Sequence, residues 1–147
     1  EKEALYRELF DKDIQPVSGL IDFLGLLDKH SIPRAIGTSA PRSNVDFTLL
    51  KTGIQNFFSI ILDESHVTHG KPSPEIYLNV AKKLGLPPQR CVVFEDSLSG
   101  VISAKKAGTK VVGITTTHTA QELSETDFII NDFKNLDPIA LFDKLFG

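Results

Sequence analysis

The chain has 147 residues, of which 41% are hydrophobic and 24% charged, and its net charge is −3. This length is enough for one domain with a hydrophobic core, and the composition is ordinary for a globular protein. The acidic balance argues against nucleic acid as a partner, and no apolar run is long enough to span a bilayer. The only cysteine, Cys91, excludes an intramolecular disulfide, and we therefore expect a cytoplasmic protein.

Helical and extended patterns alternate along the first half of the chain. Residues 1–10 are predicted to be the end of a helix, and apolar residues at helical spacing predict another helix over 17–27. A short strand over 34–38 comes next, followed by a helix that buries Val45, Leu49 and Leu50 and ends at Gly53. The run 57–62, apolar except for Ser59, predicts a strand that is covered on both faces.

The second half continues the alternation. A polar loop over 63–73 precedes a helix that starts at Pro74 and ends at Gly85. Strands are predicted over 91–95, 110–114 and 128–130, with a helix after the first, one helical turn over 120–123, and a closing helix over 138–146. This order favours an α/β fold with three α/β/α layers, in which helices cover both faces of a mostly parallel sheet.

The strand over 91–95 runs directly into two adjacent carboxylates, those of Glu95 and Asp96. Open α/β sheets bind ligands at the carboxyl ends of their strands, and two neighbouring negative charges need a cation or hydrogen-bond donors to offset them. The alternative is a helix N-cap, in which Asp96 or Ser97 accepts hydrogen bonds from free backbone N–H groups. The motif by itself leaves both interpretations open.

Other polar residues follow the predicted strands and meet at the same edge of the sheet. They are Thr38 and Ser39, Asp63, and the three threonines 115–117, with Lys71 brought to this side by the loop after Leu62. Hydroxyl and ammonium groups can bind phosphoryl oxygens, and paired carboxylates can hold Mg²⁺. Phosphoryl transfer needs mainly such positioning and charge neutralisation. Alternatively, Lys71 is an ordinary solvated lysine.

Three motifs in this order resemble the haloacid dehalogenase-like (HAD) superfamily, and most closely its capped phosphatases and β-phosphoglucomutases. They are the segments 36–39, 70–75 and 93–97, the last followed by Gly100, Ala104, Ala107 and Gly108. The resemblance covers nearly the whole chain and implies a Rossmann-like core domain. It divides the chain into residues 1–13, the end of a helical cap and its linker, and residues 14–147, the core domain.

The resemblance also implies roles for individual residues. Thr38 matches the residue that hydrogen-bonds the transferring phosphoryl group, and Lys71 matches the lysine that neutralises the phosphate and the nucleophile. Glu95 and Asp96 match the acidic pair of the Mg²⁺ site, with Asp96 the firmer ligand. Ser39 and Ala40 would lie beside the phosphate. Arg42 reaches the substrate in some relatives, but it could equally lie on the surface.

The family's nucleophile is the first aspartate of an Asp-X-Asp motif at the end of an early strand. The one literal match is the segment 11–13, which we reject because charged helical sequence precedes it instead of an apolar strand. We therefore expect a core that lacks the nucleophile strand and a chain that is inactive as given. In relatives this strand lies between the strands that end at Thr38 and Glu95. Here the position between those two strands would be unoccupied, and their buried backbone N–H and C=O groups would lack hydrogen-bond partners at a cost in stability.

The expected function is Mg²⁺-dependent hydrolysis of a small phosphorylated metabolite, such as a sugar phosphate, through an aspartyl-phosphate. One alternative is a phosphosugar mutase of the β-phosphoglucomutase type, and another is a non-catalytic fragment or degenerate binding module. A receiver-like domain is disfavoured because Lys71 precedes the acidic pair. We expect a monomer or weak dimer that binds neither membrane nor nucleic acid. His66 and His69 are interpreted as solvated loop residues because no third metal ligand lies nearby.

Overall fold

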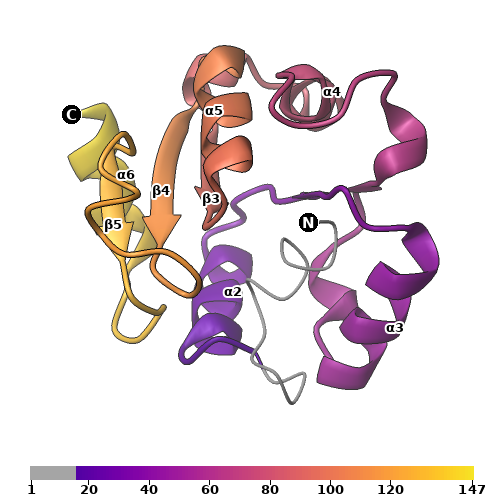
Figure 1. The fold of residues 1–147 in the computed structure, drawn as a ribbon. Coiled ribbons are helices and arrows are strands. Elements are labelled where there is room, and N and C mark those ends of the chain that lie inside the picture. The colour runs from indigo at the N-terminus through magenta and orange to yellow at the C-terminus, as the bar shows by residue number, and fades with distance from the viewer. Residues whose placement is uncertain (1–15) are drawn as a thin grey trace.

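The computed structural model describes residues 16–147, which contain two parallel sheets, and Figure 1 labels the strands of the larger one. In the first sheet, β1 (Ile36–Gly37) pairs with β2 (Ile61–Leu62). In the second, the central strand β4 (Lys110–Ile114) lies between β3 (Val92–Glu95) and β5 (Phe128–Ile130). All three strand pairs are parallel, so the carboxyl ends of paired strands lie at the same edge of each sheet.

Helices cover both faces of the strands. One hydrophobic cluster joins the strands to α2 (Leu20–Lys29), α3 (Arg42–Thr52) and α6 (Pro138–Phe146). A second cluster joins them to α4 (Glu75–Leu84) and α5 (Leu98–Ala107). Three short 3-10 helices complete the elements: η1 (Gln55–Phe57), η2 (Glu64–His66) and η3 (Pro88–Arg90). The described residues therefore form the three-layer, Rossmann-like α/β fold that the alternation predicts.

Local chemistry explains where the helices of the second half start and stop. The Ser97 hydroxyl accepts a hydrogen bond from the Gly100 N–H at the start of α5, and the Asp137 carboxylate caps α6 in the same way. The helix α5 ends at Gly108, whose φ of +91° lies in the left-handed region that glycine adopts without strain. Strand β4 is buried along most of its length, because helices cover it on both sides.

Two predicted details of the first half are wrong. Only Ile61–Leu62 of the apolar run 57–62 is a strand, because Phe57 closes a 3-10 turn and packs its partly buried side chain on the core without pairing its backbone in a sheet. Leu50 is 67% exposed, because the buried stripe of α3 passes through Val45, Thr48 and Leu49. The single helical turn predicted over 120–123 is present, with one helical hydrogen bond from the Leu123 N–H to the Thr119 carbonyl.

Strands β1 and β3 belong to separate sheets. In a parallel strand, each residue's N–H and C=O point to the same side, and the side alternates along the strand. The Thr38 N–H donates a hydrogen bond to the Leu62 carbonyl of β2, so the N–H and C=O groups of Gly37 point away from β2. The Cys91 carbonyl accepts a hydrogen bond from the Lys110 N–H of β4, so the N–H and C=O groups of Val92 and Phe94 point away from β4. An apolar cavity of about 490 Å³ lies between the two strands and is lined by both.

In the part of the chain that the structure describes, no helix is long and apolar enough to cross a membrane. Residues 1–15 lie outside the described part. The predicted cap helix over 1–10 and the rejected Asp-X-Asp segment 11–13 therefore fall on residues of which the structure says nothing.

Candidate active site

Lys71 is a buried, paired residue and not a solvated loop lysine. Its side chain is 4% exposed, and its Nζ lies 2.6 Å from Glu95 Oε2 and 3.0 Å from the Tyr77 hydroxyl oxygen. The loop before α4 holds this position from both ends. The Glu75 carboxylate accepts hydrogen bonds from the backbone N–H groups of Thr68 and His69, and the Ser103 hydroxyl donates to the Ser73 carbonyl at 2.6 Å.

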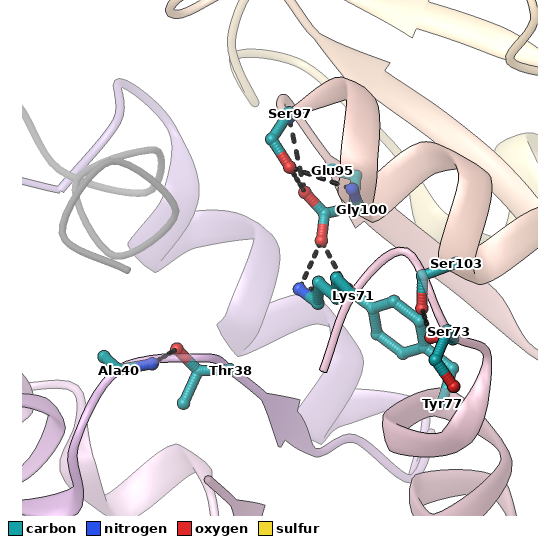
Figure 2. A network of polar contacts seen from close by, with 9 residues as sticks. All are labelled: Thr38, Ala40, Lys71, Ser73, Tyr77, Glu95, Ser97, Gly100 and Ser103. Carbon is teal, nitrogen blue, oxygen red and sulfur yellow. Dashed lines mark hydrogen bonds and ion pairs between the residues drawn. The ribbon is translucent and has the colours of Figure 1, made fainter. Parts of the chain in front are cut away.

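Glu95, the last residue of β3, is the centre of a network of donors (Figure 2). Its Oε2 atom accepts hydrogen bonds from the Lys71 ammonium and, at 2.5 Å, from the Tyr77 hydroxyl. Its Oε1 atom accepts from the hydroxyl and the backbone N–H of Ser97 at 3.2 and 3.4 Å. The carboxylate is 1% exposed, and these donors together offset the cost of burying its charge.

Asp96 lies beside this network but has different partners. It is completely buried, and its Oδ2 atom accepts hydrogen bonds from the hydroxyls of Thr116 and Thr117 at 2.7 and 2.9 Å. Its Oδ1 atom is buried and has no hydrogen-bond partner in the described part of the chain. Burial raises the pKa of Asp96 to about 6, although the two threonine hydroxyls lower it in part. Such an orphaned carboxylate oxygen is the donor that a hard cation requires.

Thr38 lies at the end of β1, on the other side of the site. Its Oγ1 atom accepts a hydrogen bond from the Ala40 N–H at 3.0 Å, which leaves its own hydroxyl proton free to donate. Thr38 and Ser39 line a cavity of about 240 Å³ together with Lys71. Thr38 also lines the apolar cavity between β1 and β3, as do Glu95 and Asp96.

The structure thus brings together most of the residues predicted for the site. Lys71 contacts Glu95 directly, whereas Thr38 forms a separate contact with Ala40 in Figure 2. Ala40 is buried and contributes its backbone N–H. Arg42 forms an exposed ion pair with Asp46 of α3 at 2.9 Å and lines neither cavity.

The helix N-cap predicted at Asp96 or Ser97 is formed by Ser97. Ser97 caps α5, which leaves Glu95 and Asp96 to the site. His66 accepts a hydrogen bond from the Asp63 N–H, and His69 lies on the surface next to Glu75. Among the described residues, no group of three or more histidine, cysteine or acidic side chains could hold a metal ion.

Tyr77 is the residue of this network that the sequence analysis missed. A tyrosine early in the helix that follows Pro74 was the only local signal, and it is also typical of core packing. Burial, followed by the negative charge of Glu95, raises the pKa of Tyr77 well above its usual value. Its hydroxyl therefore stays protonated and donates to Glu95.

The fold and the site define an α/β protein with a lysine, hydroxyl groups and two carboxylates gathered near the carboxyl ends of its central strands. Residues 2–114 match the haloacid dehalogenase-like hydrolase family, and the chain belongs to this family. It is 34% identical to validoxylamine A 7'-phosphate phosphatase from Streptomyces hygroscopicus subsp. limoneus over 116 residues. These residues are 79% of this chain and 54% of that protein.

Two further proteins extend the comparison. A phosphorylated carbohydrates phosphatase from Thermotoga maritima is 35% identical over 108 residues, which are 74% of this chain and 48% of that protein. The crystal structure of HAD hydrolase, family IA, variant 3 from Entamoeba histolytica matches with a TM-score of 0.85 and 34% identity, over 99% of this chain and 68% of that one. The chain spans about half the length of the two curated relatives.

Proposed function

We propose that this chain contributes the phosphate-binding half of a Mg²⁺-dependent phosphatase that acts on small phosphorylated metabolites. The observation that carries the proposal is that Thr38 and Lys71 line the same cavity of about 240 Å³. The two residues, one with a hydroxyl and one with an ammonium group, come from elements that lie 33 positions apart in the sequence, β1 and the loop before α4. A phosphoryl group needs such donors around its charged oxygens.

Thr38 orients the phosphoryl group, and Lys71 neutralises its charge. The Thr38 hydroxyl, whose oxygen already accepts from Ala40, donates its proton toward a phosphoryl oxygen. Lys71 supplies a positive charge that offsets the charge on the phosphoryl group as its ester P–O bond breaks. Hydrolysis consumes one water, places a proton on the leaving alcohol oxygen and releases inorganic phosphate.

Asp96 fits the metal site that the family implies, because its Oδ1 atom is buried and without a partner in the described residues. Glu95 fits less well as a direct ligand, since donors contact both of its carboxylate oxygens. We therefore assign Asp96 as a Mg²⁺ ligand and Glu95 as the partner of Lys71. Bound Mg²⁺ would neutralise charge on the phosphoryl group.

The nucleophile belongs, in this proposal, to a strand seated between β1 and β3. Gly37, Val92 and Phe94 direct their backbone groups toward the apolar cavity there, and Thr38 and Asp96 also line it. A parallel strand in this cavity would pair with both edges. An aspartate at its carboxyl end would lie beside Thr38 and Asp96 and could form an aspartyl-phosphate, which water then hydrolyses.

The substrate class rests on the names of the relatives. One of them is a phosphatase of validoxylamine A 7'-phosphate and another is a phosphatase of phosphorylated carbohydrates. We therefore propose that the substrate is a small metabolite phosphate with a polar, sugar-like leaving group.

The test measures phosphate release from a panel of sugar phosphates, phosphoglycolate and nucleotides, with Mg²⁺ and with a chelator. The chain is assayed alone and mixed with a peptide that carries an apolar strand ending in Asp-X-Asp. We expect Mg²⁺-dependent release only with the peptide, and we expect Thr38→Val and Lys71→Arg to lower the rate at least tenfold. Arg42→Ala serves as the matched control and should keep the full rate, because Arg42 lines neither cavity.

Other outcomes would assign a different function. Conversion of a sugar 1-phosphate to its 6-phosphate, without phosphate release, would identify a mutase. No turnover of any substrate under any of these conditions would contradict the enzyme proposal and favour a binding module.

A further inference from the structure

The Tyr77 hydroxyl is a buried polar group that the proposed phosphatase mechanism does not yet use. It belongs to the first turn of α4, and its ring packs in the hydrophobic cluster around Ile76 and Val101. A ring in that place needs no hydroxyl, because a phenylalanine would fill the same space. The hydroxyl nevertheless contacts both charged members of the site, Lys71 and Glu95.

The three polar atoms form a closed triangle. Lys71 Nζ lies 2.6 Å from Glu95 Oε2 and 3.0 Å from the Tyr77 oxygen, and the Tyr77 oxygen lies 2.5 Å from the same Oε2 atom. An ammonium group has three N–H donors, and these two contacts use two of them. These two contacts leave the third N–H unused, and Lys71 lines the cavity of about 240 Å³ together with Thr38 and Ser39.

We propose that Tyr77 is a positioning residue that orients the Lys71 ammonium for its phosphoryl contact. With Glu95 alone, the ammonium could rotate and swing about a single hydrogen bond. The second contact to Tyr77 fixes two of its three donors and thereby the direction of the third. This inference rests on the proposed function, because it assigns Lys71 a phosphoryl group to bind.

The packing around Tyr77 supports a fixed position for its hydroxyl. Gly37 of β1 lies so close to α4 that a Cβ atom there would be 3.1 Å from a Val80 methyl group and 3.5 Å from the Tyr77 ring. This close approach places the Tyr77 ring next to the strand that ends at Thr38. The raised pKa of the Tyr77 hydroxyl keeps its proton on the donor side of the bond to Glu95.

The experiment compares Tyr77→Phe with Thr109→Val in the full chain. Thr109 is a matched control, because its hydroxyl is also buried and donates one hydrogen bond, to the Ala104 carbonyl at 3.0 Å, at the far end of α5. The first readout is the proton–nitrogen NMR signal of the Lys71 ammonium, assigned by its loss in Lys71→Arg. We expect slow hydrogen exchange in the wild type and Thr109→Val, and exchange at least about fivefold faster in Tyr77→Phe.

The second readout is the affinity for inorganic phosphate, measured by calorimetry. Loss of one orienting hydrogen bond should weaken phosphate binding about three- to tenfold in Tyr77→Phe and leave it unchanged in Thr109→Val. Unchanged affinity in Tyr77→Phe would overturn the positioning role, even if ammonium exchange is faster. A wild-type chain that binds no phosphate would overturn the proposed function itself, while the NMR readout would still decide whether Tyr77 holds Lys71.

Discussion

The backbone of Gly100 in α5 lies directly against the Glu95 carboxylate at the end of β3. A Cβ atom on Gly100 would overlap all three atoms of that carboxylate. Glu95 can therefore reach Lys71 and Tyr77 only because residue 100 has no side chain (Figure 2). The start of α5 is thus shaped around the carboxylate that anchors the site.

Gly100→Ala should destabilise the protein by about 1–3 kcal/mol, because the added methyl group forces the buried carboxylate from its donors. Gly25→Ala is the matched control, since Gly25 lies within α2 and an added Cβ meets nothing within 4 Å. Alanine there should stabilise the helix by about 0.5–1 kcal/mol. Urea unfolding measures both changes. Equal stability of Gly100→Ala and the wild type would contradict the close contact.

Lys71 and Glu95 should show strong thermodynamic coupling. Both side chains are almost fully buried, so Lys71→Met leaves an unpaired carboxylate and should cost about 3–5 kcal/mol. The double variant Lys71→Met with Glu95→Gln removes both charges and should recover most of that loss. A double-mutant cycle from urea unfolding checks this prediction. Additive effects of the two single substitutions would show that the pair is not coupled.

Asp96 should make the metal-free protein less stable as pH rises. Its pKa is about 6 in the folded protein, against a usual value of 3.8, because the carboxylate is buried. Between about pH 4 and pH 6 the folded chain keeps a proton that the unfolded chain releases, so the free energy of unfolding falls by up to about 3 kcal/mol over that window. Above about pH 6, Asp96 is ionised in both states and the whole loss of stability is present.

Asp96→Asn should remove this pH dependence and raise stability near about pH 7.5 in the presence of a chelator. Mg²⁺ should stabilise the wild type but not the variant, because binding to the folded state alone raises its stability. Asp143→Asn, at an exposed position of α6, is the control for the loss of one charge. Urea unfolding at several pH values measures these effects, and a pH profile shared by Asp96→Asn and the wild type would refute the assignment.

Glu75 should hold the loop that carries Lys71. Hydrogen bonds from the backbone N–H groups of Thr68 and His69 lower the pKa of Glu75, so this anchor holds at neutral pH and is lost as pH falls through the lowered value. Glu75→Ala should speed hydrogen exchange at those two amides about tenfold and lower phosphate affinity.

Glu122→Ala is the matched control for Glu75→Ala. The Glu122 carboxylate accepts a hydrogen bond from the Thr119 N–H in the same manner, but in another loop. This variant should speed exchange at Thr119 and leave Thr68 and phosphate binding unchanged. If Glu122→Ala weakened phosphate binding as much as Glu75→Ala, the effect would not come from the Lys71 loop.

Amide exchange should alternate along β3. Val93 directs its N–H toward β4, whereas Val92 and Phe94 direct theirs toward the apolar cavity. We therefore expect slow exchange at Val93 and faster exchange at Val92 and Phe94. A peptide strand that fills the cavity should slow exchange at the last two residues only. Uniform protection along β3 would mean that its free edge is already paired.

Local sequence patterns determined most of the secondary structure. The strands Lys110–Ile114 and Phe128–Ile130 and the helix Pro138–Phe146 have the predicted bounds, because apolar runs, a proline at a helix start and capping residues act over a few positions. The order of strands and helices likewise predicted parallel sheets between helical layers. It also brought Thr38, Lys71, Glu95 and Asp96 to one region, since parallel strands share a direction.

The tertiary structure alone decided how these residues divide their roles. Lys71 and Glu95 lie 24 positions apart, and only packing of α4 and α5 on the sheets brings them to 2.6 Å and adds the Tyr77 hydroxyl. Only the fold shows that both Glu95 oxygens are engaged while Asp96 Oδ1 stays free. An apolar run such as 57–62 indicates that its side chains are buried, but it does not indicate whether its backbone pairs in a sheet. Pairing and partner choice depend on residues far away in the chain, which no local pattern contains.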